Sequence, residues 1–89
     1  MASYRIEWKQ SARKELRKLA KAAIPKILKA AAALAENPHP TGSKKLRGSE
    51  YTYRIRVGDY RVVYSVYSNI LVIEIVRVGH RKDIYRRLT

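Results

Sequence analysis

A regular alternation of apolar and polar residues, beginning at residue 51, constrains the fold of this chain more than any other feature. Apolar or aromatic side chains occupy every second position of residues 51–57 and again of residues 60–67. A period of two is typical of β-strands with one buried face. Gly58-Asp59 between the two segments suits a two-residue hairpin turn, so we expect the strands to pair antiparallel.

A third strand is predicted for residues 70–78, which are almost continuously apolar and β-branched. Such a run is typical of a central strand that is covered on much of both faces. Ser68-Asn69 predicts a tight turn before this strand, and Gly79 predicts its end. The three strands are therefore expected to form an antiparallel meander.

The first half of the chain predicts one strand and two helices. Residues 4–8 alternate as a half-buried strand does. Ser11 is expected to cap the first helix, and the second is expected to start near Pro25 and to end at Asn37-Pro38. The expected apolar stripes are Ala12, Leu16, Leu19 and Ala20 on the first helix, and Ile24, Ile27, Leu28, Ala31, Leu34 and Ala35 on the second.

Together these elements predict a single α+β domain over residues 1–89. An N-terminal strand and an αα-hairpin precede the three-stranded meander, and the helices pack on one face of the sheet. With 89 residues, 46% of them hydrophobic, the chain can build one core and is not expected to be disordered.

Composition excludes several classes of protein. The chain contains no cysteine and two histidines, so we expect no disulfide, no thiolate nucleophile, no structural metal and no cofactor. Its first residues carry charges where a signal peptide needs an apolar stretch, and no apolar run is long enough to cross a membrane. These features predict a soluble cytoplasmic protein.

The charge balance points to a polyanionic partner. Twenty Lys and Arg against seven Asp and Glu give a net charge of +13. Nucleic acid is the first candidate, with an anionic membrane or an acidic protein as alternatives. The predicted helices carry seven of the cations. These cations either form a solvated face, bind the phosphates of ribosomal RNA, or bind a membrane surface. These are Arg13, Lys14, Arg17, Lys18, Lys21, Lys26 and Lys29.

Three arginines are expected to converge on the sheet face away from the helices. Arg54 and Arg56 lie two residues apart on one strand, so their side chains share a face. The turn at Gly58-Asp59 places Arg56 directly opposite Arg61, about 5 Å away. Like charges so close need a counter-anion, and guanidinium groups match phosphate oxygens. The alternative is a solvated strand face that happens to be basic.

The segment after the third strand adds two titratable side chains, His80 and Tyr85, next to Arg81. A histidine with a pKa near 6.5 can move protons at neutral pH, and neighbouring positive charges lower the pKa of a tyrosine. Taken singly, His80 also fits a surface role and Tyr85 a packing role. His39 is interpreted as structural or incidental.

Three blocks of this sequence resemble the RelE/ParE superfamily of bacterial and archaeal toxins. They are residues 44–48 (KKLRG), residues 53–64 (YRIRVGDYRVVY) and residues 78–85 (VGHRKDIY). The size of the chain and the predicted order of its elements also match, so the resemblance covers nearly the whole chain. It implies a RelE-like fold and a toxin of a type II toxin–antitoxin system.

The RelE branch implies a ribosome-dependent endoribonuclease that cuts mRNA in the decoding site. The 2′-hydroxyl attacks the adjacent phosphodiester and leaves a 2′,3′-cyclic phosphate and a 5′-hydroxyl. By position, Arg61 would hold the scissile phosphate, Arg81 would assist the leaving 5′-oxygen, and Tyr85 would orient the substrate or act as the base. Further residues expected to bind substrate are Arg54, Arg56, His80, Lys45 and Arg47.

Arg54 and Arg56 stand where the best-known branch has lysines. Arginine binds phosphate but does not act as a general base, so that role falls to Tyr85, to His80, or to the RNA and ribosome. The implied partners are an acidic antitoxin that folds on the toxin, and ribosome-bound mRNA with its ribosomal RNA contacts. The two alternatives are a ParE-like inhibitor of DNA gyrase and a non-catalytic RNA-binding or ribosomal protein. The combination of Arg61, Arg81 and Tyr85 favours the RelE branch.

Overall fold

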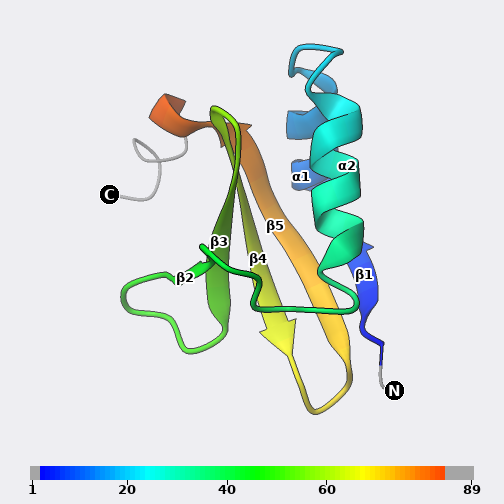
Figure 1. The fold of residues 1–89 in the computed structure, drawn as a ribbon, viewed down its shortest axis with the longest axis vertical. Helices are drawn as coiled ribbons and strands as arrows, with labels where there is room; N and C mark the ends of the chain where they lie inside the picture. The colour runs from blue at the N-terminus through cyan, green and yellow to red at the C-terminus, as the bar shows by residue number, and fades with distance from the viewer. Residues whose placement is uncertain (1–2, 84–89) are drawn as a thin grey trace.

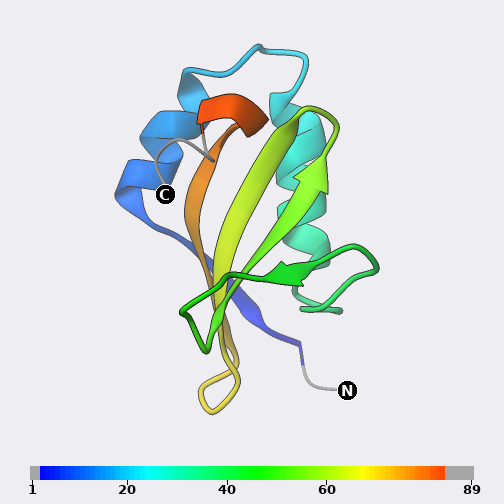
Figure 2. The same cartoon turned by 90° about the vertical axis from the view of Figure 1, so that its left-hand side faces the viewer.

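Helices α1 and α2 cover one face of a five-stranded sheet in the computed structural model, which describes residues 3–83 (Figure 1). The helices are α1 (Gln10–Arg17) and α2 (Ile24–Ala33), and the strands are β1 (Arg5–Trp8), β2 (Lys44–Lys45), β3 (Thr52–Val57), β4 (Tyr60–Tyr67) and β5 (Val72–His80). The sheet face that the helices leave uncovered is turned to the viewer in Figure 2. The predicted α+β architecture, with the helices on one face, is confirmed.

The strand order is β1-β5-β4-β3-β2. The antiparallel meander of β3, β4 and β5 is confirmed, and β1 adds to it by pairing parallel to β5. The prediction that the apolar run of the third meander strand lies inside the sheet, covered on much of both faces, is confirmed, because β5 lies between β1 and β4 and none of its residues is exposed; the middle strand of the five is β4. β4 is buried from Arg61 to Val66, since it has a neighbouring strand on each side and side chains over both faces.

The turn between β3 and β4 sets the register of the cationic residues. Gly58 has a φ of +61°, a conformation that glycine adopts at little cost, and the hairpin reverses over Gly58 and Asp59 as predicted. Arg56 therefore lies opposite Arg61 and Val57 opposite Tyr60. The pairing predicted from the sequence is confirmed at these positions.

The boundaries of β5 differ from the predicted ones. Ile70 and Leu71 belong to the turn, where Ile70 is 63% exposed and Leu71 has a φ of +55°. The turn is longer than the predicted two residues, Ser68 and Asn69, and it includes the next two residues, which are apolar. At the other end, Gly79 does not stop the strand, because it pairs with Arg61.

The expected apolar stripes are confirmed in part, and the ends of the helices are shifted. Leu19 and Ala20 of the first stripe lie beyond α1, and Ala20 is exposed. Helix α1 begins at Gln10 after Lys9, so the prediction that Ser11 caps it is wrong, and it ends at Arg17. Helix α2 begins at Ile24 with Pro25 in its first turn, as predicted, but ends at Ala33, before Asn37. Of its predicted stripe, Leu28 is 44% exposed, because it lies outside the face that packs on the sheet.

The core lies between the helices and the sheet. Buried side chains from α2 meet those of β3, β4 and β5, and the alternating residues of β1 pack around them. Its buried members are Ala12, Ile27, Ala31, Leu34, Ile55, Val62, Tyr64, Val66, Ile73, Ile75 and Val78. Neither α1 nor α2 is both long and apolar enough to cross a lipid bilayer.

Candidate functional site

Arg54, Arg56 and Arg61 line the same pocket, which has a volume of about 410 Å³. Arg54 and Arg56 come from β3, and Arg61 lies directly opposite Arg56 on β4. Lys44 of β2 also lines this pocket. We call it the arginine pocket; its remaining lining residues are Thr41, Gly42 and Ile55.

Arg61 is held in place by the turn that precedes it. Its residue is only 4% exposed, and its Nη1 donates hydrogen bonds to the carbonyl oxygens of Gly58 (3.2 Å) and Tyr60 (3.0 Å). Gly79 lies opposite Arg61 on β5 and carries no side chain. A guanidinium is always charged, and burying it is costly unless it is hydrogen-bonded. The backbone carbonyls thus stabilise a buried cation and fix its direction.

Lys44 lines the arginine pocket, although it is not among the binding residues expected from the sequence. Lys44 pairs with Arg54 and Lys45 pairs with Tyr53, so the two lysines point to opposite faces of the sheet. Lys44 shares the face of the arginines, whereas Lys45 lies on the face of Tyr53. Neighbouring residues of a strand point to opposite faces, so only one of the two lysines can face the arginines. Which one does so depends on the register of β2, and a two-residue strand is too short for its register to be predicted from the sequence.

One wall of the arginine pocket is the loop before β2, which Tyr64 anchors from the core. The hydroxyl of Tyr64 donates a hydrogen bond of 2.8 Å to the carbonyl oxygen of Pro38, and Ser43 is a further partner. Burial raises the pKa of Tyr64 to about 12. The rings of His39, Tyr53 and Tyr64 follow one another at 4.7 Å and 6.0 Å, which makes His39 part of this structural contact.

His80 lies apart from the three arginines. It pairs with Tyr60, whose side chain packs against the core, so both rings are on the helix side of the sheet, 5.8 Å apart. Its Nδ1 accepts a hydrogen bond of 3.3 Å from the backbone N–H of Lys82. His80 also borders a small cavity together with Glu15 of α1.

Arg81 starts a short helical turn at the end of the sheet where β3 and β4 are joined (Figure 1). Its backbone N–H donates a hydrogen bond of 2.8 Å to the carbonyl oxygen of Asp59, so it lies beside the turn that leads to Arg61. Arg47 is exposed in the turn after β2 and does not line the arginine pocket. Tyr85 lies outside the described residues.

The arginine pocket is suited to a phosphate group. Two like-charged pairs face each other across strands, Arg56 with Arg61 and Lys44 with Arg54, and such pairs are destabilising without a counter-anion. Among the described residues that line the pocket, none is acidic. Within residues 3–83, no three His, Cys, Asp or Glu side chains gather in a way that could hold a metal ion. The four cations that line the arginine pocket can bind an anion and stabilise its charge.

Comparison with known proteins places the chain among toxins. Residues 6–85 match the family model described as the ParE toxin of the type II toxin–antitoxin system parDE. A RelE-like toxin protein of Escherichia coli is 37% identical over 86 residues, which cover 92% of this chain and 90% of that protein. Toxin RelG of Mycobacterium tuberculosis is 32% identical over 85 residues, covering 94% and 98%.

Solved structures agree with this placement. The archaeal RelE–RelB complex from Pyrococcus horikoshii contains a chain with a TM-score of 0.78 and 34% identity, over 89% of this chain and 96% of that chain. The isolated Escherichia coli RelE toxin has a TM-score of 0.77 and 26% identity, over 98% and 100%. From its sequence, its sheet order and these relatives, the chain belongs to the RelE/ParE family of toxins of type II toxin–antitoxin systems.

Proposed function

We propose that this toxin is a ribosome-dependent endoribonuclease that cleaves translated mRNA. The observation that carries the proposal is the arginine pocket, where Lys44, Arg54, Arg56 and Arg61 gather without an acidic lining residue among those described. The 2′-hydroxyl of the RNA attacks the adjacent phosphorus, the bond to the 5′-oxygen breaks, and a 2′,3′-cyclic phosphate and a 5′-hydroxyl remain. Negative charge builds on the phosphate during this step, and fixed cations stabilise it.

We assign each residue a role in the cleavage step from its position. Arg61 is held rigidly by backbone carbonyls and serves to stabilise the charge of the transition state, while Arg54 and Arg56 grip the phosphate and its neighbours. Arg81 acts on the leaving 5′-oxygen. The proton of the 2′-hydroxyl goes to a base that is not an arginine. The position of His80 on the other face argues against that histidine and favours Tyr85 or a group of the RNA or ribosome.

Cleavage on programmed ribosomes tests this proposal. Purified toxin is added to ribosomes stalled on a defined mRNA, and the new 5′ ends are mapped. We expect cleavage at the codon in the decoding site, and a loss of about 10²-fold or more in rate for both Arg61→Ala and Arg81→Ala. Arg5→Ala is the matched control, because Arg5 is an exposed arginine on β1, paired with Glu7. Wild-type cleavage by the Arg61→Ala variant would remove Arg61 from the mechanism, and intact mRNA with the wild-type toxin would refute the activity.

We also propose that an acidic antitoxin binds this chain. Several of the similar solved structures are complexes of a RelE toxin with its RelB antitoxin, and a net charge of +13 attracts an acidic partner. Co-expression of the toxin with the neighbouring open reading frame should give a complex that contains a second, acidic chain. Normal growth of the host under unrestrained expression of the toxin alone would argue against it.

Inhibition of DNA gyrase is the second candidate function, because the matching family model is that of the ParE toxin. A supercoiling assay with purified gyrase separates the two candidates. Loss of supercoiling at toxin concentrations that leave ribosome-bound mRNA intact would support the gyrase function. Cleavage of mRNA without an effect on gyrase would support the ribonuclease.

A further inference from the structure

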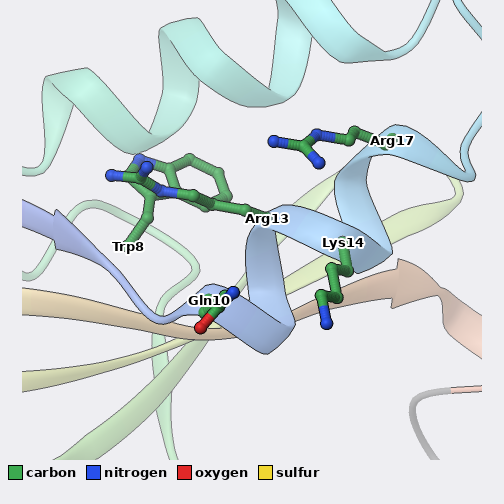
Figure 3. Close-up of a pocket in the computed structure, with 5 residues that line it drawn as sticks. All are labelled: Trp8, Gln10, Arg13, Lys14 and Arg17. Atoms are coloured by element: carbon green, nitrogen blue, oxygen red, sulfur yellow. The ribbon is translucent and has the colours of Figure 1, made fainter.

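A second basic pocket lies on the helical side of the molecule. Trp8 at the end of β1 and four residues of α1 line a pocket of about 410 Å³ (Figure 3). We call it the α1 pocket; the four residues are Gln10, Arg13, Lys14 and Arg17. It shares no described lining residue with the arginine pocket. It belongs to the helices rather than to the uncovered sheet face.

The three cations of the α1 pocket have no acidic partner in the part of the chain that the structure describes. No ion pair there involves Arg13, Lys14 or Arg17. The only carboxylate of α1, that of Glu15, turns to β5, where it pairs with Arg77 and accepts a hydrogen bond from the Val78 backbone N–H. The carboxylate of α1 therefore faces the sheet, and its three cationic side chains line the pocket.

Trp8 gives the α1 pocket a flat aromatic surface. Its side chain is half-buried at the edge of the core, and Figure 3 shows the side chain of Arg13 directed toward the indole. Arg13 and Arg17 are one helical turn apart, so they project from the same side of α1. Cations along a groove next to an aromatic ring are the combination that binds single-stranded nucleic acid, with phosphates on the cations and a base stacked on the ring.

We propose that the α1 pocket is a second RNA-binding site, in which one base of a single-stranded segment stacks on Trp8 and its phosphates contact Arg13, Lys14 and Arg17. An acidic peptide fits less well, since an amphipathic helix needs an apolar groove, and Trp8 is the only apolar side chain that lines this pocket among the described residues. This proposal rests on the proposed function, which supplies the single-stranded RNA: the mRNA or the ribosomal RNA near the decoding site.

The fluorescence of Trp8 tests the site directly, because it is the only tryptophan of the chain. A short oligoadenylate is added to the full-length Arg61→Ala variant without ribosomes, and the indole emission is followed. We expect quenching as the base stacks. Anisotropy of a labelled oligoadenylate should show an affinity about tenfold lower for Trp8→Leu. For the double variant Arg13→Ala/Arg17→Ala, the slope of log affinity against log salt should fall by about 1.4, since each phosphate contact on a single strand contributes about 0.7.

The control is Lys26→Ala/Lys29→Ala, which removes the same charge from exposed positions of α2 outside the pocket. The proposal is overturned if the oligoadenylate binds without changing the indole emission, or if this control weakens binding as much as Arg13→Ala/Arg17→Ala. Quenching by polyglutamate at the same concentration and salt would also overturn it and assign the pocket to an acidic protein. Because the assay needs neither ribosomes nor cleavage, failure of the α1 pocket leaves the nuclease proposal standing, and the reverse holds as well.

Discussion

Arg61 is an almost fully buried cation whose direction the backbone sets. Its Nη1 bonds to the carbonyl oxygens of Gly58 and Tyr60, so the position of the guanidinium depends on the hairpin turn itself. A lysine at this position keeps the charge but not the planar fork that bonds to carbonyls and phosphate together. Geometry, more than charge, should therefore decide the function of this residue.

Arg61→Lys tests that distinction. We expect the variant to remain at least about tenfold slower than wild type in cleavage on programmed ribosomes, while Arg61→Ala loses about 10²-fold or more. Lys29→Arg on α2, which makes the reverse exchange at an exposed position, should leave the rate unchanged. Full activity of Arg61→Lys would mean that a point charge is sufficient.

Tyr64 links the core to the loop that walls the arginine pocket, and its stability contribution depends on pH. Burial raises the pKa of Tyr64 from 10.0 to about 12. Between these values the unfolded chain has lost the hydroxyl proton that the folded chain still holds. The folded state is therefore stabilised below the lower value, and this stabilisation is lost as the pH rises toward the higher one.

Tyr64→Phe should remove this pH dependence. At neutral pH we expect a loss of about 1–2 kcal/mol in the free energy of unfolding, because the carbonyl of Pro38 loses its donor. Between about pH 9 and 12, the wild type should lose about 2 kcal/mol more than the variant. Urea unfolding over this range measures both effects, and parallel pH profiles for the two proteins would contradict the role assigned to Tyr64.

At the scale of elements, Glu15 joins α1 to the part of β5 that β1 does not cover. The pairing of β1 with β5 ends at Ile75, and the next part of β5 has an irregular register. The carboxylate of Glu15 accepts from the Val78 backbone N–H at 3.1 Å and pairs with Arg77 at 3.2 Å. The Nε of Arg77 is buried and has no hydrogen-bond partner among the described residues, so this guanidinium depends on the contact between its Nη2 and Glu15.

Glu15→Ala should lower the free energy of unfolding by about 2–3 kcal/mol, because a buried N–H and a half-buried guanidinium lose their acceptor. Glu15→Gln should cost about 1 kcal/mol, since its amide oxygen still accepts from Val78. Glu7→Ala is the control: its ion pair with Arg5 is exposed, and we expect a change within about 0.5 kcal/mol. Equal losses for the Glu7 and Glu15 variants in urea unfolding would exclude this account.

At the scale of the whole molecule, the net charge of +13 opposes folding through self-repulsion. Bound anions relieve it, and an anion that binds only the folded state adds stability by mass action. Phosphate should therefore raise the melting temperature more than chloride does at equal ionic strength, because it bonds to several cations at once.

The double variant Arg54→Gln/Arg56→Gln should lose much of the difference between phosphate and chloride in thermal melts. Lys26→Ala/Lys29→Ala, with the same change of charge on α2, should retain it. If phosphate and chloride act alike on the wild type, the arginine pocket does not select phosphate. If both variants lose the effect equally, it comes from net charge alone.

Much of this molecule follows from local pattern. The alternation around Gly58-Asp59 was enough to predict the hairpin, its register and the shared face of Arg54, Arg56 and Arg61, because strand geometry repeats every two residues. Pro25 likewise marked the start of α2. Ser11 did not cap α1, since the chain leaves β1 directly into the helix at Gln10.

Tertiary pairing decided the rest. Lys44 rather than Lys45 joins the arginines, and His80 lies beside Tyr60 on the other face, because a shift of one residue in register moves a side chain across the sheet. The α1 pocket is different, because its described lining residues all lie within residues 8–17, where the chain passes directly from β1 into α1. The sequence alone determined the hairpin of β3 and β4 and the common face of its three arginines, since these contacts are local. Which distant residues complete the arginine pocket was decided by long-range pairing, because no local period encodes the register of β2 against β3.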